Sequence, residues 1–60
     1  MCESTAYTIN GEVIMQDVIS VKIKGDTIFL ADILNKRKQL NGRIKEIDLD
    51  QHGIYIELIK

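Results

Sequence analysis

The chain carries its single cysteine at position 2, directly behind Met1. A small second residue permits removal of the initiator methionine, so we expect the mature chain to begin with Cys2. Its free α-amine and its thiolate sulfur then close a five-membered chelate ring on one metal ion, and the backbone amide nitrogen of Glu3 is the next donor. Such nitrogen and sulfur donors suit a square-planar site for Ni(II) or Cu(II). The residues therefore make Cys2 and Glu3 a candidate metal site.

One chain supplies few other strong donors, because it holds one cysteine and one histidine. Zinc prefers a tetrahedral set of thiolates and imidazoles, so a closed zinc site within one chain is not expected. Two chains supply two Cys2 groups, and a two-fold axis near the N-termini lets them share one metal ion. The alternative is that Cys2 is simply a small buried hydrophobic residue.

Two further side chains have both a structural and a chemical interpretation. His52 precedes Gly53 and is interpreted as a turn residue, with a metal ligand or pH-sensitive group as the alternative. Met15 is interpreted as a core residue, with a soft metal donor as the alternative. A nucleophilic enzyme also requires a third group that orients a Cys-His pair, and no recognisable spacing supplies one. We therefore expect no catalytic residues and no enzymatic activity.

A cluster of cations between positions 36 and 45 suggests a different function. Its members are Lys36, Arg37, Lys38, Arg43 and Lys45. A small barrel with such a basic hairpin can hold the phosphates of RNA, and this is the alternative to metal binding. However, the net charge is -1, and two tyrosines and one phenylalanine are the whole aromatic content. These features favour a solvated hairpin over a nucleic-acid partner.

The length of 60 residues predicts one small β domain over residues 1–60. A chain of this size buries only about 60% of the surface that its unfolded form exposes, so a metal or a partner chain usually supplements the core. One cysteine excludes an internal disulfide. No secretory leader and no apolar run of about 20 residues is recognised, so no membrane partner is expected. These features favour a reduced, cytoplasmic protein.

Turn dipeptides divide the chain into short runs. The glycines lie in the pairs Asn10-Gly11, Gly25-Asp26, Asn41-Gly42 and His52-Gly53, which we interpret as turns. The runs between them are rich in Ile, Val, Thr and Tyr, which favour strands. The second run covers Glu12 to Met15 and the third covers Val18 to Lys24. About six short antiparallel strands are therefore expected, and they form a small all-β barrel or curled sheet.

Alternation within the runs predicts which side chains face the core. These are Ile19, Val21 and Ile23, then Ile28 and Leu30, and finally Ile54, Ile56 and Leu58. In "GRIKEIDLD" the alternation breaks at Glu46, which predicts a β-bulge. The segment "LNKRKQL" is interpreted as a polar hairpin or a short irregular crossing, and a short helix over "LADILNKRKQL" is the alternative.

Several runs carry adjacent apolar residues, such as Ile28-Phe29-Leu30 and Val13-Ile14-Met15. Neighbours on a strand point to opposite faces, so only one of each pair can fill the core of a single barrel. Because large exposed apolar patches mark interfaces, the second face favours a homodimer.

Three segments together resemble a known family. These are the start "MCEST" with its Tyr-containing strand, then "DVISVKIKGDTIFLADIL", and then "LNGRIKEIDLDQHGIYIEL". Their order and spacing resemble the CooT family of small nickel-binding proteins, members of which have also been labelled as predicted RNA-binding proteins. The resemblance covers nearly the whole chain.

The resemblance implies an all-β homodimer that binds one Ni(II) per dimer through the cysteine after the initiator methionine, here Cys2. It also implies a link to nickel delivery for carbon monoxide dehydrogenase, so a nickel enzyme or its maturation proteins are expected partners. His52 matches a histidine near the last turn of the family.

Overall fold

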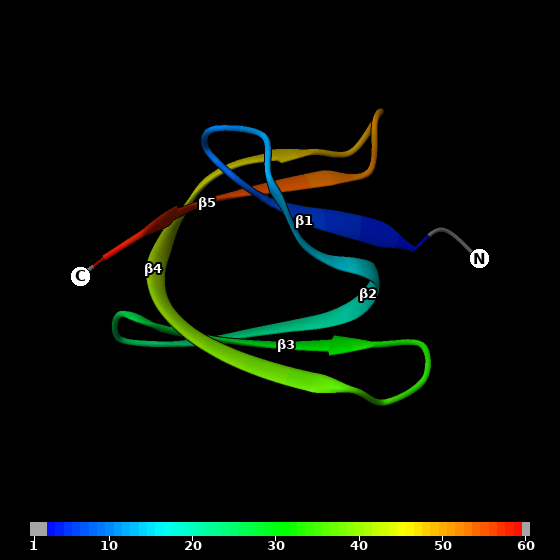
Figure 1. The fold of residues 1–60 in the computed structure, drawn as a ribbon, viewed down its shortest axis with the longest axis horizontal. Helices are drawn as coiled ribbons and strands as arrows, with labels where there is room; N and C mark the ends of the chain where they lie inside the picture. Colours follow the sequence, from blue (N-terminus) through cyan, green and yellow to red (C-terminus); the bar gives the residue numbers. More distant parts are fainter. Residues whose placement is uncertain (1–2, 60) are drawn as a thin grey trace.

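The computed structural model describes residues 3–59, and five strands account for most of them. The strands are β1 (Ser4–Thr8), β2 (Val13–Lys24), β3 (Thr27–Asp32), β4 (Arg37–Asp48) and β5 (Gly53–Leu58). They follow one another around a closed barrel in chain order (Figure 1). The prediction of a small all-β barrel is confirmed. No helix among the described residues is long and apolar enough to cross a membrane.

The described residues form five strands rather than about six because two predicted strands join. The runs Glu12–Met15 and Val18–Lys24 belong to one strand, β2, which bends at Asp17, where φ is +56°. The first half of β2 pairs with β1 and the second half pairs with β3. Figure 1 shows β2 and β4 curving from one layer of the barrel into the other.

The barrel closes through a parallel pair, which corrects the antiparallel prediction at this one seam. Residues Thr5 to Thr8 of β1 lie alongside Gly53 to Ile56 of β5, and the other four pairs of strands are antiparallel. The reason is geometric: in a meander with an odd number of strands, the first and last strands run in the same direction. The rings of Tyr7 and Tyr55 stack across this seam, with 5.2 Å between their centroids.

The helical alternative for "LADILNKRKQL" is wrong, and the polar hairpin is confirmed. Strand β3 ends at Asp32 and β4 begins at Arg37. The Asp32 carboxylate accepts hydrogen bonds from the backbone N–H groups of Leu34 (2.9 Å) and Lys36 (2.8 Å). Asn35 adopts a positive φ of 64°. An aspartate that bonds its own following backbone favours a turn over a helix.

The core is small and consists of aliphatic side chains. Its buried members are Ala6, Val18, Ile28, Leu30, Ile54 and Ile56. The predicted inward positions of β3 and the first two of β5 are therefore confirmed. Leu58, the last residue of β5, is exposed, contrary to prediction.

The alternation along β2 is interrupted by a bulge between Val18 and Ser20. The bulge turns Val18 into the core and leaves Ile19 outside, so the prediction for Ile19 is wrong. Val21 packs against the core as predicted, whereas Ile23, which is paired with Ile28, is exposed near the turn.

The predicted bulge near Glu46 is confirmed. Ile44 pairs with Ile56, but the next pair is Glu46 with Tyr55, so Lys45 is the extra residue in β4. A bulge of this kind bends the strand and increases its twist. It lets Ile44 face the core while β4 curves towards β5.

The interpretation of Asn41-Gly42 as a turn is wrong, because both residues lie inside β4. Gly42 is buried, and its N–H donates to the carbonyl of Asp26 at 2.8 Å. A Cβ atom at this position would lie 2.6 Å from the backbone oxygen of Glu57. Glycine is required here for the close approach of β4 to β5 and not for a turn.

We expect Gly42→Ala to lower the free energy of unfolding by about 2–3 kcal/mol, because a methyl group at this site forces two backbones apart. Chemical denaturation measures the change. Asn41→Ala is the control on the same strand, and its effect should stay within about 0.5 kcal/mol, as is usual for an exposed position. Equal stability of Gly42→Ala and the parent chain would contradict the close approach.

Candidate functional site

Strand β1, which follows Cys2 and Glu3 in the sequence, begins at one end of the barrel. The backbone N–H of Thr5 donates to the carbonyl of His52 at 2.9 Å, and Ser4 pairs with Val18. Glu3 is half-buried and precedes the first paired residue of β1. Cys2, the predicted thiolate ligand, lies outside the described residues. The hydrogen bond at Thr5 thus fixes the position from which Glu3 extends.

Residues 3–59 contain no further cluster of metal-ligating side chains near the start of β1. Among residues 3–59, no three side chains of the types His, Cys, Asp and Glu gather closely enough to hold a metal ion. His52 lies in the β4–β5 turn with a φ of +55°, and its side chain is exposed. The interpretation of His52 as a turn residue is confirmed. Met15 packs against the core, as interpreted from the sequence.

The same end of the barrel exposes four aliphatic side chains, which we call the apolar rim. They are Ile33, Leu34, Ile47 and Leu49. Leu34 and Leu49 are 74% and 80% exposed. The N–H of Ile33 donates to the carbonyl of Asp17 at 3.0 Å, which ties the β3–β4 turn to β2 near the start of β1. Figure 1 shows the β3–β4 and β4–β5 turns at the end of the barrel where β1 begins.

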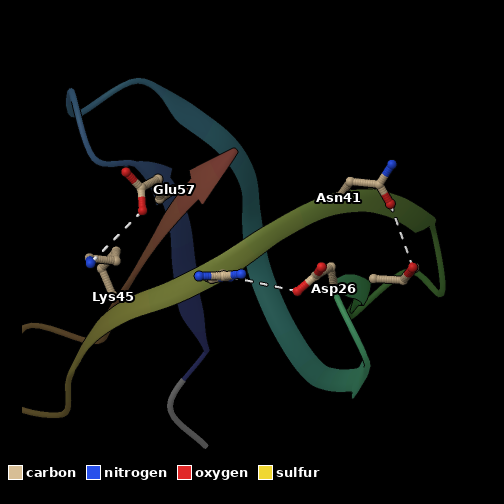
Figure 2. A network of polar contacts seen from close by, with 6 residues as sticks. Asp26, Asn41, Lys45 and Glu57 are labelled. Carbon is tan, nitrogen blue, oxygen red and sulfur yellow. Dashed lines mark hydrogen bonds and ion pairs between the residues drawn. The ribbon is translucent and has the colours of Figure 1, made fainter. Parts of the chain in front are cut away.

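The predicted basic hairpin is not gathered into one free patch. Arg43 pairs with Asp26 at 3.6 Å, and Lys45 pairs with Glu57 at 3.9 Å (Figure 2). Lys38 donates from Nζ to the carbonyl of Ile14 at 3.1 Å. The cations that remain near the β3–β4 turn are Lys36 and Arg37, and Arg37 donates from Nη2 to the side-chain oxygen of Asn35 at 3.2 Å.

The sequence interpretation missed a cation on the neighbouring strand. The register places Lys22 beside Phe29, on the outer face of the sheet that β2, β3 and β4 form. A hollow of about 490 Å³ lies there, and Arg37 also lines it. The signal was the alternation of lysines in "VKIK" together with Phe29, which has the opposite parity to Ile28 and Leu30.

Comparison with known proteins gives consistent sequence matches. The model of the family described as CO dehydrogenase accessory protein CooT matches residues 1–57. An uncharacterized protein of Methanothermobacter thermautotrophicus is 46% identical over 57 residues, which are 95% of this chain and 89% of that protein. A second uncharacterized protein, from Methanocaldococcus jannaschii, is 42% identical over 57 residues, 95% of this chain and 98% of its own.

The fold has a counterpart among solved structures. The crystal structure of a provisionally assigned CooT from Carboxydothermus hydrogenoformans superposes with a TM-score of 0.88 and 27% sequence identity. The match covers 98% of this chain and 100% of that one. Because the family model spans nearly every residue, the chain belongs to the CooT family of CO dehydrogenase accessory proteins.

Proposed function

We propose that this protein is a nickel-binding accessory protein that works as a homodimer and holds one Ni(II) through the thiolates of two Cys2 residues. The observation that carries the proposal is the sequence Cys2-Glu3 directly ahead of β1, in a chain that belongs to the CooT family. The nickel ion is cargo, delivered to a client enzyme. The protein itself catalyses no reaction.

The nitrogen and sulfur donors that Cys2 and Glu3 offer suit Ni(II). Ladder pairing of β1 begins at Ser4 and Thr5, so the backbone nitrogen of Glu3 lies outside the paired region. Once Met1 is removed, the α-amine and thiolate of Cys2 and the amide nitrogen of Glu3 form a contiguous set. Ni(II) accepts nitrogen and sulfur donors in a square-planar site. The side chain of Glu3 takes no part.

The apolar rim supports the dimer. Burying a Leu side chain such as Leu34 or Leu49 contributes about 1.5–3 kcal/mol relative to leaving it in water. An interface over this end would bring two copies of Glu3 close to the symmetry axis. An isologous interface of this kind makes one shared metal ion sufficient for two chains.

The partner that follows from the family is carbon monoxide dehydrogenase or its maturation machinery. RNA binding by the basic hairpin, Lys36 to Lys45, is the competing function. It predicts an affinity that falls steeply with salt and does not depend on Cys2. The ion pairs of Arg43 and Lys45 favour nickel over RNA, because they leave fewer cations available to phosphates.

We expect Cys2→Ser to weaken Ni(II) binding at least about a hundredfold, because a hydroxyl is a much poorer ligand than a thiolate. Glu3→Pro, which lacks the amide proton, should also weaken binding and abolish the absorption bands of the square-planar complex. Glu3→Ala is the matched control and should bind as the parent chain does. Isothermal titration and absorption spectroscopy of Met1-free protein measure both effects.

Unchanged affinity in Cys2→Ser would contradict the site itself. Equal loss in Glu3→Ala and Glu3→Pro would instead contradict the backbone nitrogen as a ligand and point to the carboxylate. Thermal unfolding of each variant without nickel shows whether the barrel is intact.

We expect the double variant Leu34→Gln and Leu49→Gln to weaken dimerisation at least about a hundredfold, because two apolar side chains leave the interface. Sedimentation equilibrium measures the effect. Ile9→Gln combined with Leu58→Gln is the control, because both are exposed apolar residues that follow the Thr8–Ile56 pair, at the end of the seam opposite to Thr5 and Gly53. Loss of the dimer in the control alone would place the interface at that end.

A further inference from the structure

The outer face of β2, β3 and β4 presents an ordered array of side chains. Partners across antiparallel strands point to the same face, and Ile28 and Leu30 point into the core, so the alternate positions point outward. The register forms three rows: Ser20, Ala31 and Arg37; Lys22, Phe29 and Gln39; Lys24, Thr27 and Asn41. One exposed aromatic ring thus lies at the centre of a polar and basic surface.

A hollow of about 490 Å³ lies over this array. Its apolar lining includes Ile19 and Phe29, and its positive charge comes from Lys22, Arg37 and Lys38. Phe29 is 38% exposed and Ile19 is 56% exposed, so both can contact a ligand. None of the described residues that line the hollow is acidic. Its volume falls within the range of about 300–1,000 Å³ that is usual for ligand sites.

The cations of this face have no carboxylate partner within residues 3–59. The ion pairs of the described chain join Arg43 to Asp26 and Lys45 to Glu57, on other parts of the barrel. Asp32, the carboxylate at the end of β3, accepts hydrogen bonds from its own turn. Three of the eight lysines and arginines, Lys22, Lys24 and Arg37, lie in the outward rows, and none of the residues that line the hollow is acidic. This local excess of positive charge favours an anionic partner.

We propose that this outer face binds an extended peptide segment of a partner protein, in which carboxylates flank an apolar side chain. The apolar side chain contacts Phe29 and Ile19, while the carboxylates contact Lys22 and Arg37. Asn35 accepts one hydrogen bond from Arg37, which orients the guanidinium and leaves its other donors for a carboxylate. This inference goes beyond nickel binding, and its failure leaves the Cys2 site untouched.

Two features favour a peptide over single-stranded nucleic acid. The face holds one aromatic ring, whereas strands of nucleic acid stack successive bases on several rings. The overall charge is also slightly negative, and proteins that hold phosphate backbones usually carry a basic excess. The closed ring of strands leaves no free edge in the described chain, so the peptide lies across the face and binds through side chains.

The test is fluorescence anisotropy with a labelled peptide of roughly ten residues that alternates Asp or Glu with Leu, a length that crosses the three strands. We expect Lys22→Ala with Arg37→Ala to weaken binding at least about tenfold, and Phe29→Ala to weaken it about fivefold. Arg43→Ala with Lys45→Ala is the matched control, because it removes the same charge from another part of the barrel. The control should bind like the parent chain.

Three results would overturn the proposal. The first is a dissociation constant for the peptide above about 1 mM. The second is an equal loss of peptide affinity in the Lys22/Arg37 and Arg43/Lys45 double variants. The third is tighter binding of an oligothymidine than of the peptide. The last result would assign the face to nucleic acid. Because Lys22 and Arg37 are exposed, their variants should keep the fold, and thermal unfolding verifies this.

Discussion

The parallel pairing of β1 with β5 converts an open meander into a barrel, and the other features depend on it. Ala6 and Ile54 face each other across this seam, and both are buried only because the ring is closed. The hydrogen bond from Thr5 to the carbonyl of His52 fixes the first residues of β1. The β4–β5 turn, in which His52 adopts a positive φ, therefore holds both the seam and the start of the candidate metal site.

So small a barrel requires long strands that bend sharply. Strands β2 and β4 have 12 residues each, and each is shared between two neighbours. The bend of β2 at Asp17 and the extra residue Lys45 in β4 provide the curvature. Gly42 allows β4 to approach β5 closely where a side chain would collide with Glu57. These adjustments enclose six buried aliphatic residues and leave both the apolar rim and the basic outer face in solvent.

Local patterns predicted the all-β class, the bulge near Glu46, the β3–β4 hairpin and most inward positions, because alternation directly reflects burial. They failed for the inward positions Ile19, Ile23 and Leu58 and for the turn at Gly42. The bulge in β2 changes which residues face the core, and no particular residue type marks its position. In the sequence, a glycine that is required for close packing, such as Gly42, cannot be told from a glycine in a turn. The pairing of β1 with β5 is parallel because the number of strands is odd, and the pattern within any one strand does not reveal that number. Lys22 was missed because its neighbour Phe29 is adjacent only in the folded sheet.

We propose that metal binding and recognition of an acidic peptide use different parts of the barrel: the start of β1 for the metal, and the outer face of β2, β3 and β4 for the peptide. The sharing of one nickel ion by two Cys2 thiolates is the central proposal. A native mass spectrum of untagged protein with stoichiometric Ni(II) tests it most directly. We expect a dimer that lacks Met1 and carries one nickel ion. A metal-free species, with Met1 confirmed absent, would contradict it.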